Sequence, residues 1–329
     1  MNVLVAGGAG YIGSHAVLAL EKAGHKVTVY DNLVTGHVES VPESVLLIEG
    51  DLLDTDFLKH VLVTYEIDAV VHFAAFSLVG ESMERPEEYY RNNVLGTFSL
   101  LAAMKSAGVD KIVFSSTAAV YGEPEEWLIK ETAQTAPTNV YGRTKLTVEG
   151  MLADYSRAYD LQYVSLRYFN AAGAAAGGKI GEAHTPETHL IPLVLKTALG
   201  QRKSVQIFGT DYPTADGTCM RDYVHVDDLA AAHVLALEHL SREGGNRVYN
   251  LGSETGFSVR QVIETAKKVT GVDFAVEERP RRAGDPAVLV ASSETIRREL
   301  GWEPQKSDLE TIVRDAWAWH KAHPRGYAE

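Results

Sequence analysis

Three glycines close to the start of the chain, Gly7, Gly10 and Gly13, strongly constrain what this sequence of 329 residues can fold into. The apolar residues 3–6 before them predict a buried parallel strand, and residues 14–23 after them predict a helix. In this context Gly7 permits a tight turn, Gly10 lets the backbone approach a pyrophosphate, and Gly13 lets the helix pack closely on the strand. The spacing is G-x-x-G-x-x-G rather than G-x-G-x-x-G, and a plain strand-to-helix turn is the alternative.

An acidic residue follows the second predicted strand, residues 26–30, and supports a dinucleotide site. Asp31 lies 18 positions after Gly13 (31 − 13), close to the spacing of about 20 at which a carboxylate hydrogen-bonds an adenosine ribose. A carboxylate accepts a hydrogen bond from a 2′-hydroxyl and repels a 2′-phosphate, so the sequence predicts NAD rather than NADP. Taken alone, Asp31 could equally be a solvated turn residue.

Short apolar strands alternate with helices in the first half, which predicts an α/β fold with a doubly wound, Rossmann-type parallel sheet. Further strands are expected at 45–51, 69–75, 111–116 and 164–170. A long amphipathic helix is expected over 86–107. Asp51 ends a strand, where it either bonds the adenine amino group or caps the helix expected over 54–63. His72 lies within a strand and is expected to be a core histidine rather than a ligand.

Composition limits the classes of partner. The formal net charge is −13 and the pI is about 5.4, which argue against binding to nucleic acid or to acidic membranes. The single cysteine, Cys219, excludes an intrachain disulfide and a cysteine-based zinc site, and we expect no metal. No basic segment with an apolar stretch opens the sequence, and no run reaches about 18 apolar residues. We therefore expect a cytoplasmic protein without a membrane span.

The second half predicts a smaller, mixed α/β substrate-binding domain. A stretch rich in glycine and alanine, 171–181, marks the change of domain. We expect residues 1–170 to form the NAD-binding domain and 171–329 mainly the substrate-binding domain, with a strand and a helix from about 223–251 returning to the first. Helices are expected at about 190–199, 226–240 and 309–320, and strands at 205–208, 248–251 and within 280–290.

A tyrosine, a lysine and a hydroxyl group point to redox chemistry at an alcohol carbon. Tyr141 and Lys145 are four positions apart at the start of a helix expected to run to about 158, so they share one helix face. A phenol is a poor base at neutral pH, but a nearby ammonium and a nicotinamide cation favour the phenolate. Thr117, at the end of the fifth strand, is placed to hydrogen-bond the reacting oxygen. The Tyr-x-x-x-Lys pattern alone is weak evidence for this chemistry. Its position after five strands of a nucleotide-binding pattern makes it specific.

Over essentially its whole length the sequence resembles the extended short-chain dehydrogenase/reductases, and within them the UDP-glucose 4-epimerases. Motifs of the first half are shared with dehydratases, decarboxylases and reductases of nucleotide sugars, whereas the stretch 211–226 is the most specific to the epimerases. The matching segments are Gly7 to Gly13, Asp31-Asn32-Leu33, Asp51-Leu52, Phe73-Ala74-Ala75, Asn92-Asn93, Ser115-Ser116-Thr117, Tyr141 to Lys145, Leu166 to Asn170, Ile207-Phe208-Gly209, Asp211 to Thr214, Asp216-Gly217-Thr218, Arg221 to Val226 and Arg281 to Asp285.

The resemblance implies where two ligands bind. The residues that it assigns to NAD are Gly7, Gly10, Tyr11, Ile12, Gly13, Asp31, Asn32, Leu33, Thr35, Gly36, Asp51, Leu52, Phe73, Ala74, Ala75, Ser77, Asn92, Ser115, Tyr141, Lys145 and Phe169. The residues that it assigns to a UDP-sugar are Thr117, Tyr141, Asn170, His189, Leu190, Gln206, Ile207, Phe208, Arg221, Tyr223, Arg282 and Asp285. Arg221 and Arg282 are candidates for the diphosphate, since guanidinium forks match phosphate oxygens. Leu190, Ile207 and Phe208 are candidates for the wall beside the uracil.

The resemblance also implies a reaction cycle. Tyr141 takes the proton of the sugar 4′-hydroxyl while C4′ gives hydride to tightly held NAD; the 4-keto sugar turns over, and hydride returns to its other face. Two positions limit the comparison. Ser77 stands where some members have a lysine near the cofactor. Leu289 aligns loosely with a gate residue beside the sugar, and its intermediate size leaves UDP-GlcNAc open as a substrate.

Other functions stand as alternatives. A nucleotide-sugar 4,6-dehydratase needs an extra acid after the serine or threonine, but Ala118 and Ala119 follow Thr117. A non-catalytic, NAD-binding regulator often loses the tyrosine or the lysine, and here both are present. By resemblance we expect a homodimer joined through the helices around 92–107 and 143–158; packing of their apolar residues on the sheet is the alternative.

Overall fold

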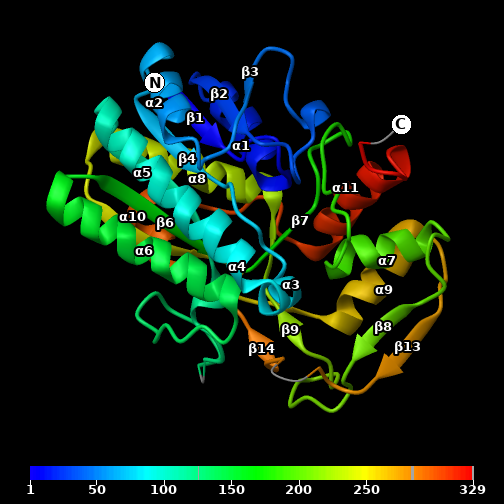
Figure 1. Ribbon diagram of the computed structural model, residues 1–329. Coiled ribbons are helices and arrows are strands. Elements are labelled where there is room, and N and C mark those ends of the chain that lie inside the picture. The colour runs from blue at the N-terminus through cyan, green and yellow to red at the C-terminus, as the bar shows by residue number, and fades with distance from the viewer. Residues whose placement is uncertain (125, 283–284, 328–329) are drawn as a thin grey trace.

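The computed structural model describes residues 1–124, 126–282 and 285–327 and is organised around a seven-stranded parallel sheet (Figure 1). Its strands are β1 (Asn2–Ala6), β2 (Lys26–Asp31), β3 (Leu46–Glu49), β4 (Ala69–His72), β5 (Lys111–Thr117), β6 (Gln162–Tyr168) and β11 (Asn246–Leu251). They lie in the order β11-β6-β5-β4-β1-β2-β3, and every pair is parallel. The order reverses between β1 and β4, where ligands bind in open α/β sheets. The predicted Rossmann-type sheet is confirmed.

Helices cover both faces of this sheet, which is why its strands are apolar almost throughout. One face carries α2 (Thr55–Thr64), α5 (Gly96–Ala107) and α6 (Val140–Tyr159), and the other carries α1 (Tyr11–Lys22), α8 (Val226–Arg242) and α10 (Glu294–Leu300). Alternate residues of β1 show the division: Val3 and Val5 pack with α1 and α8, whereas Leu4 packs with α2 and α5. Both faces of the sheet are therefore hydrophobic cores.

The long helix predicted over 86–107 is interrupted. It consists of α4 (Pro86–Tyr89), a π-helical turn η2 (Tyr90–Leu95) and α5, preceded by the short helix α3 (Val79–Glu84). The π turn places the side chain of Asn93 against the loop after β4, where its Oδ1 accepts a bond from Phe76 N at 2.8 Å and its Nδ2 donates to Phe76 O at 3.0 Å. The helix therefore changes from α to π geometry at the turn where Asn93 holds the loop after β4.

A smaller unit lies beside the carboxyl ends of the strands (Figure 1). Its helices are α7 (Leu190–Ala198), α9 (Val259–Thr270) and α11 (Leu309–Ala322), which share a core that includes Ile191, Val262 and Ile312. Its strands form three small sheets. Two are two-stranded: β8 (Val205–Phe208) with β13 (Val276–Arg279), and β7 (Asn170–Ala172) with β10 (Tyr223–His225). In the third, β9 (Met220–Arg221) lies between β12 (Phe257–Ser258) and β14 (Val288–Leu289). We did not expect α9, β13 or α10 from sequence. The division into two domains stays a prediction.

Two 3₁₀ turns, η1 (Val38–Ser40) and η3 (Ala118–Val120), complete the described elements. Within the described ranges, no helix has the length and apolar content that crossing a bilayer requires.

Candidate active site

The glycine turn after β1 has the shape of a phosphate cradle. Gly7 has φ +81°, and a Cβ there would lie 2.4 Å from Ala74 N at the end of β4. A Cβ at Gly13 would lie 2.1 Å from Gly7 O, so only glycine lets α1 approach the turn this closely. At Gly10 a Cβ would meet only Gly7 O, at 3.4 Å, and α1 begins there without a side-chain cap. Its first amides are therefore available to a phosphate, and the turn fits NAD.

Asp31 ends β2 beside this turn and is buried. Its Oδ2 accepts a bond from Ala9 N at 3.0 Å and its Oδ1 accepts one from Leu33 N at 2.9 Å. Burial raises the pKa of this carboxyl, and the two backbone bonds oppose that shift. Asp31 thus ties the glycine turn to its own loop. Each oxygen has a second lone pair for a ribose hydroxyl, and that role stays a prediction.

Asp51 does not cap the following helix, so that alternative is wrong. The cap of α2 is Asp54, which accepts a bond from Phe57 N at 3.0 Å. Asp51 instead accepts bonds from Leu53 N at 2.9 Å and from Asn32 Nδ2 at 3.1 Å. The ends of β2 and β3 are thereby linked on the adenosine side of the expected site.

His72 is buried within β4, as predicted for a core histidine. Its Nε2 lies 2.8 Å from Thr97 Oγ1, and burial lowers its pKa to about 3. The ring is therefore neutral at physiological pH.

The structure brings Tyr141, Lys145 and Thr117 together at the carboxyl end of the sheet. Asn139 caps α6 by accepting a bond from Gly142 N at 2.8 Å, which places Tyr141 in the first helical turn and Lys145 in the second. Lys145 Nζ donates to Ser115 O at 2.9 Å and lies 6.0 Å from the centre of the Tyr141 ring. The Thr117 hydroxyl is near enough to the Tyr141 side chain to affect its pKa.

The electrostatics of this group differ from the sequence-based argument. Burial raises the pKa of Tyr141 to about 12, although the nearby Thr117 hydroxyl acts in the opposite direction. Burial also lowers the pKa of Lys145 to about 7, against an opposing effect of Glu149. The charge on Lys145 near neutral pH therefore depends on the groups around it, and a lysine one turn away does not by itself ensure a phenolate.

A buried network behind Lys145 was missed from sequence. Glu149 and Arg167 are 8% and 6% exposed, and Arg167 donates from Nε and Nη2 to the two Glu149 oxygens at 2.9 and 2.5 Å. Ser116 Oγ donates to Glu149 at 2.5 Å, and Arg167 Nη1 donates to Tyr121 OH at 2.9 Å. The spacing of four residues between Lys145 and Glu149 was the available signal, since it puts both on one helix face.

Two other residues that sequence reasoning did not assign position the start of α6. Ser82 Oγ accepts a bond from Tyr141 N at 3.1 Å, and Asn93 Nδ2 donates to Thr144 Oγ1 at 3.0 Å. The short helix α3 and the π turn are thereby fixed to the helix turn that presents the tyrosine.

On the substrate side, Arg221 and Asp285 contact each other. Arg221 Nη1 donates to Met220 O at 2.7 Å and to Pro286 O at 3.0 Å, and its Nη2 forms an ion pair with Asp285. The guanidinium of Arg282 lies 3.9 Å from the centre of the Phe208 ring. The neighbouring Ala283 and Gly284 of this motif lie outside the described residues.

The side chain of Ile207 is not placed to form a wall of the uracil site. Along β8 the burial alternates, and Ile207 is 2% exposed within the core of the smaller unit. Gln206 and Phe208 point the other way and are half-buried. The period of two in a strand explains this, because neighbouring residues face opposite sides.

The remaining predicted residues are distributed around the same region. Tyr11 OH donates to Gly173 O at 2.7 Å, so its side chain turns to the loop after β7. Leu289 pairs in register with Arg221 and packs in one apolar cluster with Phe169. Asn170 N donates to Asp222 O at 2.9 Å, and Tyr223 is buried. Ser77 is exposed, and the half-exposed His189 side chain faces Glu182 and Glu187.

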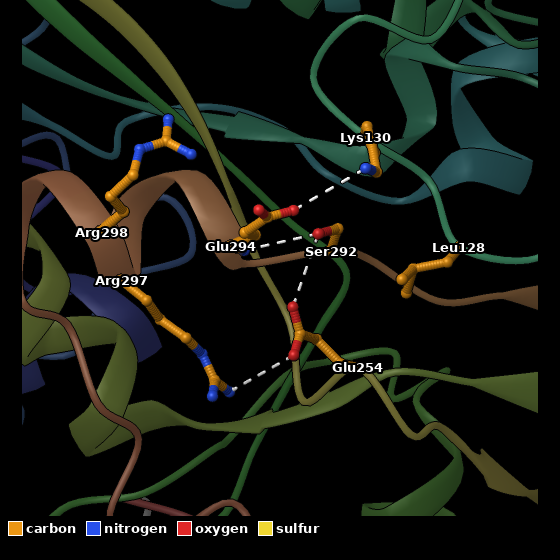
Figure 2. Close-up of a pocket in the computed structure, with 7 residues that line it drawn as sticks. All are labelled: Leu128, Lys130, Glu254, Ser292, Glu294, Arg297 and Arg298. Atoms are coloured by element: carbon orange, nitrogen blue, oxygen red, sulfur yellow. Dashed lines mark hydrogen bonds and ion pairs between the residues drawn. The ribbon is translucent and has the colours of Figure 1, made fainter.

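A separate surface hollow lies at the start of α10 (Figure 2). It is lined by Leu128, Lys130, Glu254, Ser292, Glu294, Arg297 and Arg298, none of which is a predicted site residue. Lys130 pairs with Glu294 at 3.7 Å and Arg297 with Glu254 at 4.0 Å, so its charges largely face one another.

The fold is a doubly wound sheet, and its site combines a glycine cradle with a threonine, a tyrosine and a lysine. Together they define a nucleotide-dependent site of the oxidoreductase type, and comparison with known proteins supports this class. Residues 3–252 match the model of the NAD dependent epimerase/dehydratase family, to which the chain belongs. It is 56% identical over 328 residues to a UDP-glucose 4-epimerase of Halalkalibacterium halodurans, covering 100% of this chain and 98% of the relative. Within the family, the chain is therefore a member of the UDP-glucose 4-epimerases.

Solved structures support the same assignment. A crystal structure of a UDP-glucose 4-epimerase superposes with a TM-score of 0.98 at 52% identity and full coverage of both chains. The UDP-glucose 4-epimerase of Brucella ovis in complex with NAD gives a TM-score of 0.94 at 50% identity, with 96% of this chain and 97% of that chain covered. The predictions of this family, of an isomerase and of NAD as its cofactor are confirmed.

Proposed function

We propose that this protein interconverts UDP-galactose and UDP-glucose by epimerisation at C4′, with the residue roles set out below. The observation that supports the proposal most directly is the meeting of Tyr141, Lys145 and Thr117 at the carboxyl end of the sheet. NAD supplies a group that accepts hydride from C4′ and returns it. The glycine turn, the end of β2 and the loop after β4 would hold it.

Tyr141 acts as the base and then as the acid. Its phenolic oxygen takes the 4′-hydroxyl proton as hydride leaves C4′, and it gives that proton back when hydride returns to the other face of the 4-keto sugar. Thr117 orients the reacting oxygen. Lys145, held by Ser115 O, supplies positive charge that stabilises the phenolate and would also bond the nicotinamide ribose.

The nucleotide end is held more firmly than the sugar. Arg221 and Arg282 offer guanidinium groups to the diphosphate, and Asp285 keeps Arg221 in position before the ligand arrives. The half-buried face of β8, with Gln206 and Phe208, would lie beside the uracil, and Asn170, His189, Leu190 and Tyr223 would complete this side of the site. A sugar held by few contacts can turn over between the two hydride transfers.

We also propose that the protein is a homodimer that works in the cytoplasm. Leu95 and Phe98, on the helix segment 90–107, are 53% and 52% exposed, and exposed apolar residues on neighbouring helices favour a partner surface. Tyr159, at the end of α6, is likewise exposed. Light scattering at micromolar concentration tests this, and a monomer alone would contradict it.

A substrate with an N-acetyl group is the second candidate, and the position of Leu289 favours testing it. Leu289 lies opposite Arg221 and packs near Phe169, in the region proposed for the sugar. A side chain of this size leaves more space than an aromatic residue would.

The test is to incubate the purified protein with UDP-galactose, without added NAD, and to separate the sugar nucleotides by chromatography. Formation of UDP-glucose is expected, since NAD is retained through the cycle. The variant Tyr141→Phe should lose the activity but keep its NAD, whereas Tyr159→Phe, which changes an exposed tyrosine outside the site, should keep both. Unchanged UDP-galactose with and without added NAD would refute the assignment, and UDP-GlcNAc would be tried next.

A further inference from the structure

Two glutamates and two histidines gather on the loop between β7 and α7. Glu182, His184, Glu187 and His189 each offer one ligand atom, and these atoms lie within 4.8 Å of one another. His184 Nδ1 is 3.1 Å and His189 Nδ1 is 2.7 Å from Glu182 Oε1, and His189 Nδ1 is 3.1 Å from Glu187 Oε1. Four side chains from eight consecutive positions thus converge on one point.

The two carboxylates are deeply buried, and their charge needs compensation. The side chains of Glu182 and Glu187 are 5% and 3% exposed. Among the described residues, the recorded ion-pair partners of both are His184 and His189 alone. Buried charges are expensive unless they are paired or bind a metal. Either two protonated histidines or one divalent cation with two neutral histidines would balance the pair.

One oxygen of Glu187 distinguishes these possibilities. Oε1 accepts bonds from the backbone N–H groups of Thr188 at 2.8 Å and His189 at 2.9 Å. Oε2 is buried and has no hydrogen-bond partner, and it lies 3.9 Å from His184 Nδ1 across the cluster. Buried polar atoms normally have a partner. Glu187 Oε2 therefore favours a cation in the cluster, because it faces His184 without a hydrogen-bond partner of its own.

We propose that Glu182, His184, Glu187 and His189 form a binding site for one zinc ion. Zinc takes four N and O ligands at about 2.0–2.2 Å in a tetrahedron, whose edges are then roughly 3.4 Å long. The contacts of Glu182 Oε1 with His189 and His184, at 2.7 and 3.1 Å, and of Glu187 Oε2 with His184, at 3.9 Å, lie on either side of that length. Zinc binding would therefore require these side chains to adjust their positions. Four protein ligands leave no open position, which is typical of a structural zinc site.

Contacts from outside the loop hold this site in place. Trp319 Nε1 donates to Glu182 O at 3.1 Å, His37 Nε2 lies 2.9 Å from Ala183 O, and Gly181 N donates to Tyr327 OH at 3.1 Å. The His184 ring also packs edge-on against Tyr11 of the glycine turn. The ion would therefore fasten a loop that touches both the cofactor turn and the start of α7. The expectation of no metal rests on the absence of cysteine ligands, and this cluster contains no cysteine.

Zinc binding can be measured without substrate, and His189 is the one residue that the zinc site shares with the proposed UDP-sugar site. The full chain, prepared without a histidine tag and freed of metals with a chelator, is titrated with zinc sulfate, and bound zinc is counted by mass spectrometry after gel filtration. One zinc per chain is expected, together with a higher melting temperature. Cobalt(II) in place of zinc should give the visible absorption of a tetrahedral centre.

Variants locate the site. His184→Ala/Glu187→Gln should lose the bound zinc, the cobalt spectrum and the shift in melting temperature. The control His60→Ala/Glu264→Gln removes the same two types of side chain from exposed positions of α2 and α9 and should keep all three. The milder Glu187→Gln, tested alone, should weaken zinc binding at least tenfold even if the double variant folds poorly. No stoichiometric zinc in the wild-type chain, or equal binding by the double variant, would show an ion-pair cluster only and overturn the proposal.

Discussion

Replacing Glu149 with glutamine tests whether the network behind Lys145 governs both the stability of the protein and the charge on Lys145. Glutamine has the same shape but no charge, so Arg167 would remain in a site where it is 6% exposed without its anionic partner. Removing one partner of a buried ion pair costs about 3–5 kcal/mol. We therefore expect the free energy of unfolding in urea to fall by roughly 3 kcal/mol or more.

The same substitution should change the pH dependence of activity. Glu149 opposes the burial that lowers the pKa of Lys145 to about 7. Without that carboxylate the pKa falls further, so the lysine loses its charge at lower pH. The alkaline limb of the pH–activity profile should then move to lower pH, whereas a purely structural defect would lower activity at all pH values alike.

Two further variants control the experiment. Glu310→Gln removes a carboxylate from an exposed pair with Lys268 and should cost less than about 1 kcal/mol. Adding Arg167→Met to Glu149→Gln should recover part of the lost stability, because the uncompensated charge is removed with its partner. A loss below about 1 kcal/mol for Glu149→Gln, with an unshifted profile, would refute this account of the network.

Three other predictions test separate parts of the structure. Gly13→Ala should abolish copurification of NAD, measured by chromatography of the denatured protein, because the new Cβ would lie 2.1 Å from Gly7 O. The control Gly80→Ala, whose Cβ would meet nothing within 4 Å, should retain NAD. Retained NAD in Gly13→Ala would contradict the proposed phosphate cradle. His233 is buried, and burial lowers its pKa to about 4, so below its unfolded value of about 6.5 the unfolded chain binds a proton that the folded chain does not. The free energy of unfolding should therefore decrease as the pH is lowered from about 6.5 to about 4. His233→Gln should reduce the slope of that free energy against pH by about 1.4 kcal/mol per pH unit. Parallel plots for the variant and the wild type would contradict the argument. Leu289→Ala should raise the activity ratio of UDP-GlcNAc to UDP-glucose by roughly tenfold, and an unchanged ratio would place Leu289 away from the sugar.

Local signals predicted the cofactor half of the protein well. The turn at Gly7 to Gly13, the acid at Asp31 and the pair Tyr141 and Lys145 all depend on short spacings, and such spacings fix which groups share a turn or a helix face. The alternation of strands and helices was likewise sufficient for the parallel sheet. Even so, the sequence left two roles open for Asp51, an adenine contact or the cap of α2, and only the backbone geometry shows that Asp54 is the cap.

Groups that meet only through long-range packing were not predictable in the same way. The network of Glu149, Arg167 and Tyr121 joins α6, β6 and the turn after β5, and the orientation of Ile207 depends on which side of β8 faces the core of the smaller unit. The same holds for the burial that moves the pKa of Tyr141 and Lys145 in directions unfavourable to the phenolate.

The sequence by itself therefore determined the class of fold and the cofactor, and it proposed the reacting side chains, because each of these inferences rests on residue type and local spacing. Only the tertiary structure decided what surrounds those side chains: which charges lose their water, which carboxylates share a partner, and how the loop with Glu182 and Glu187 folds on itself. The physical reason is that desolvation and charge pairing depend on distances between segments far apart in the chain, and those distances exist only after the layers have packed.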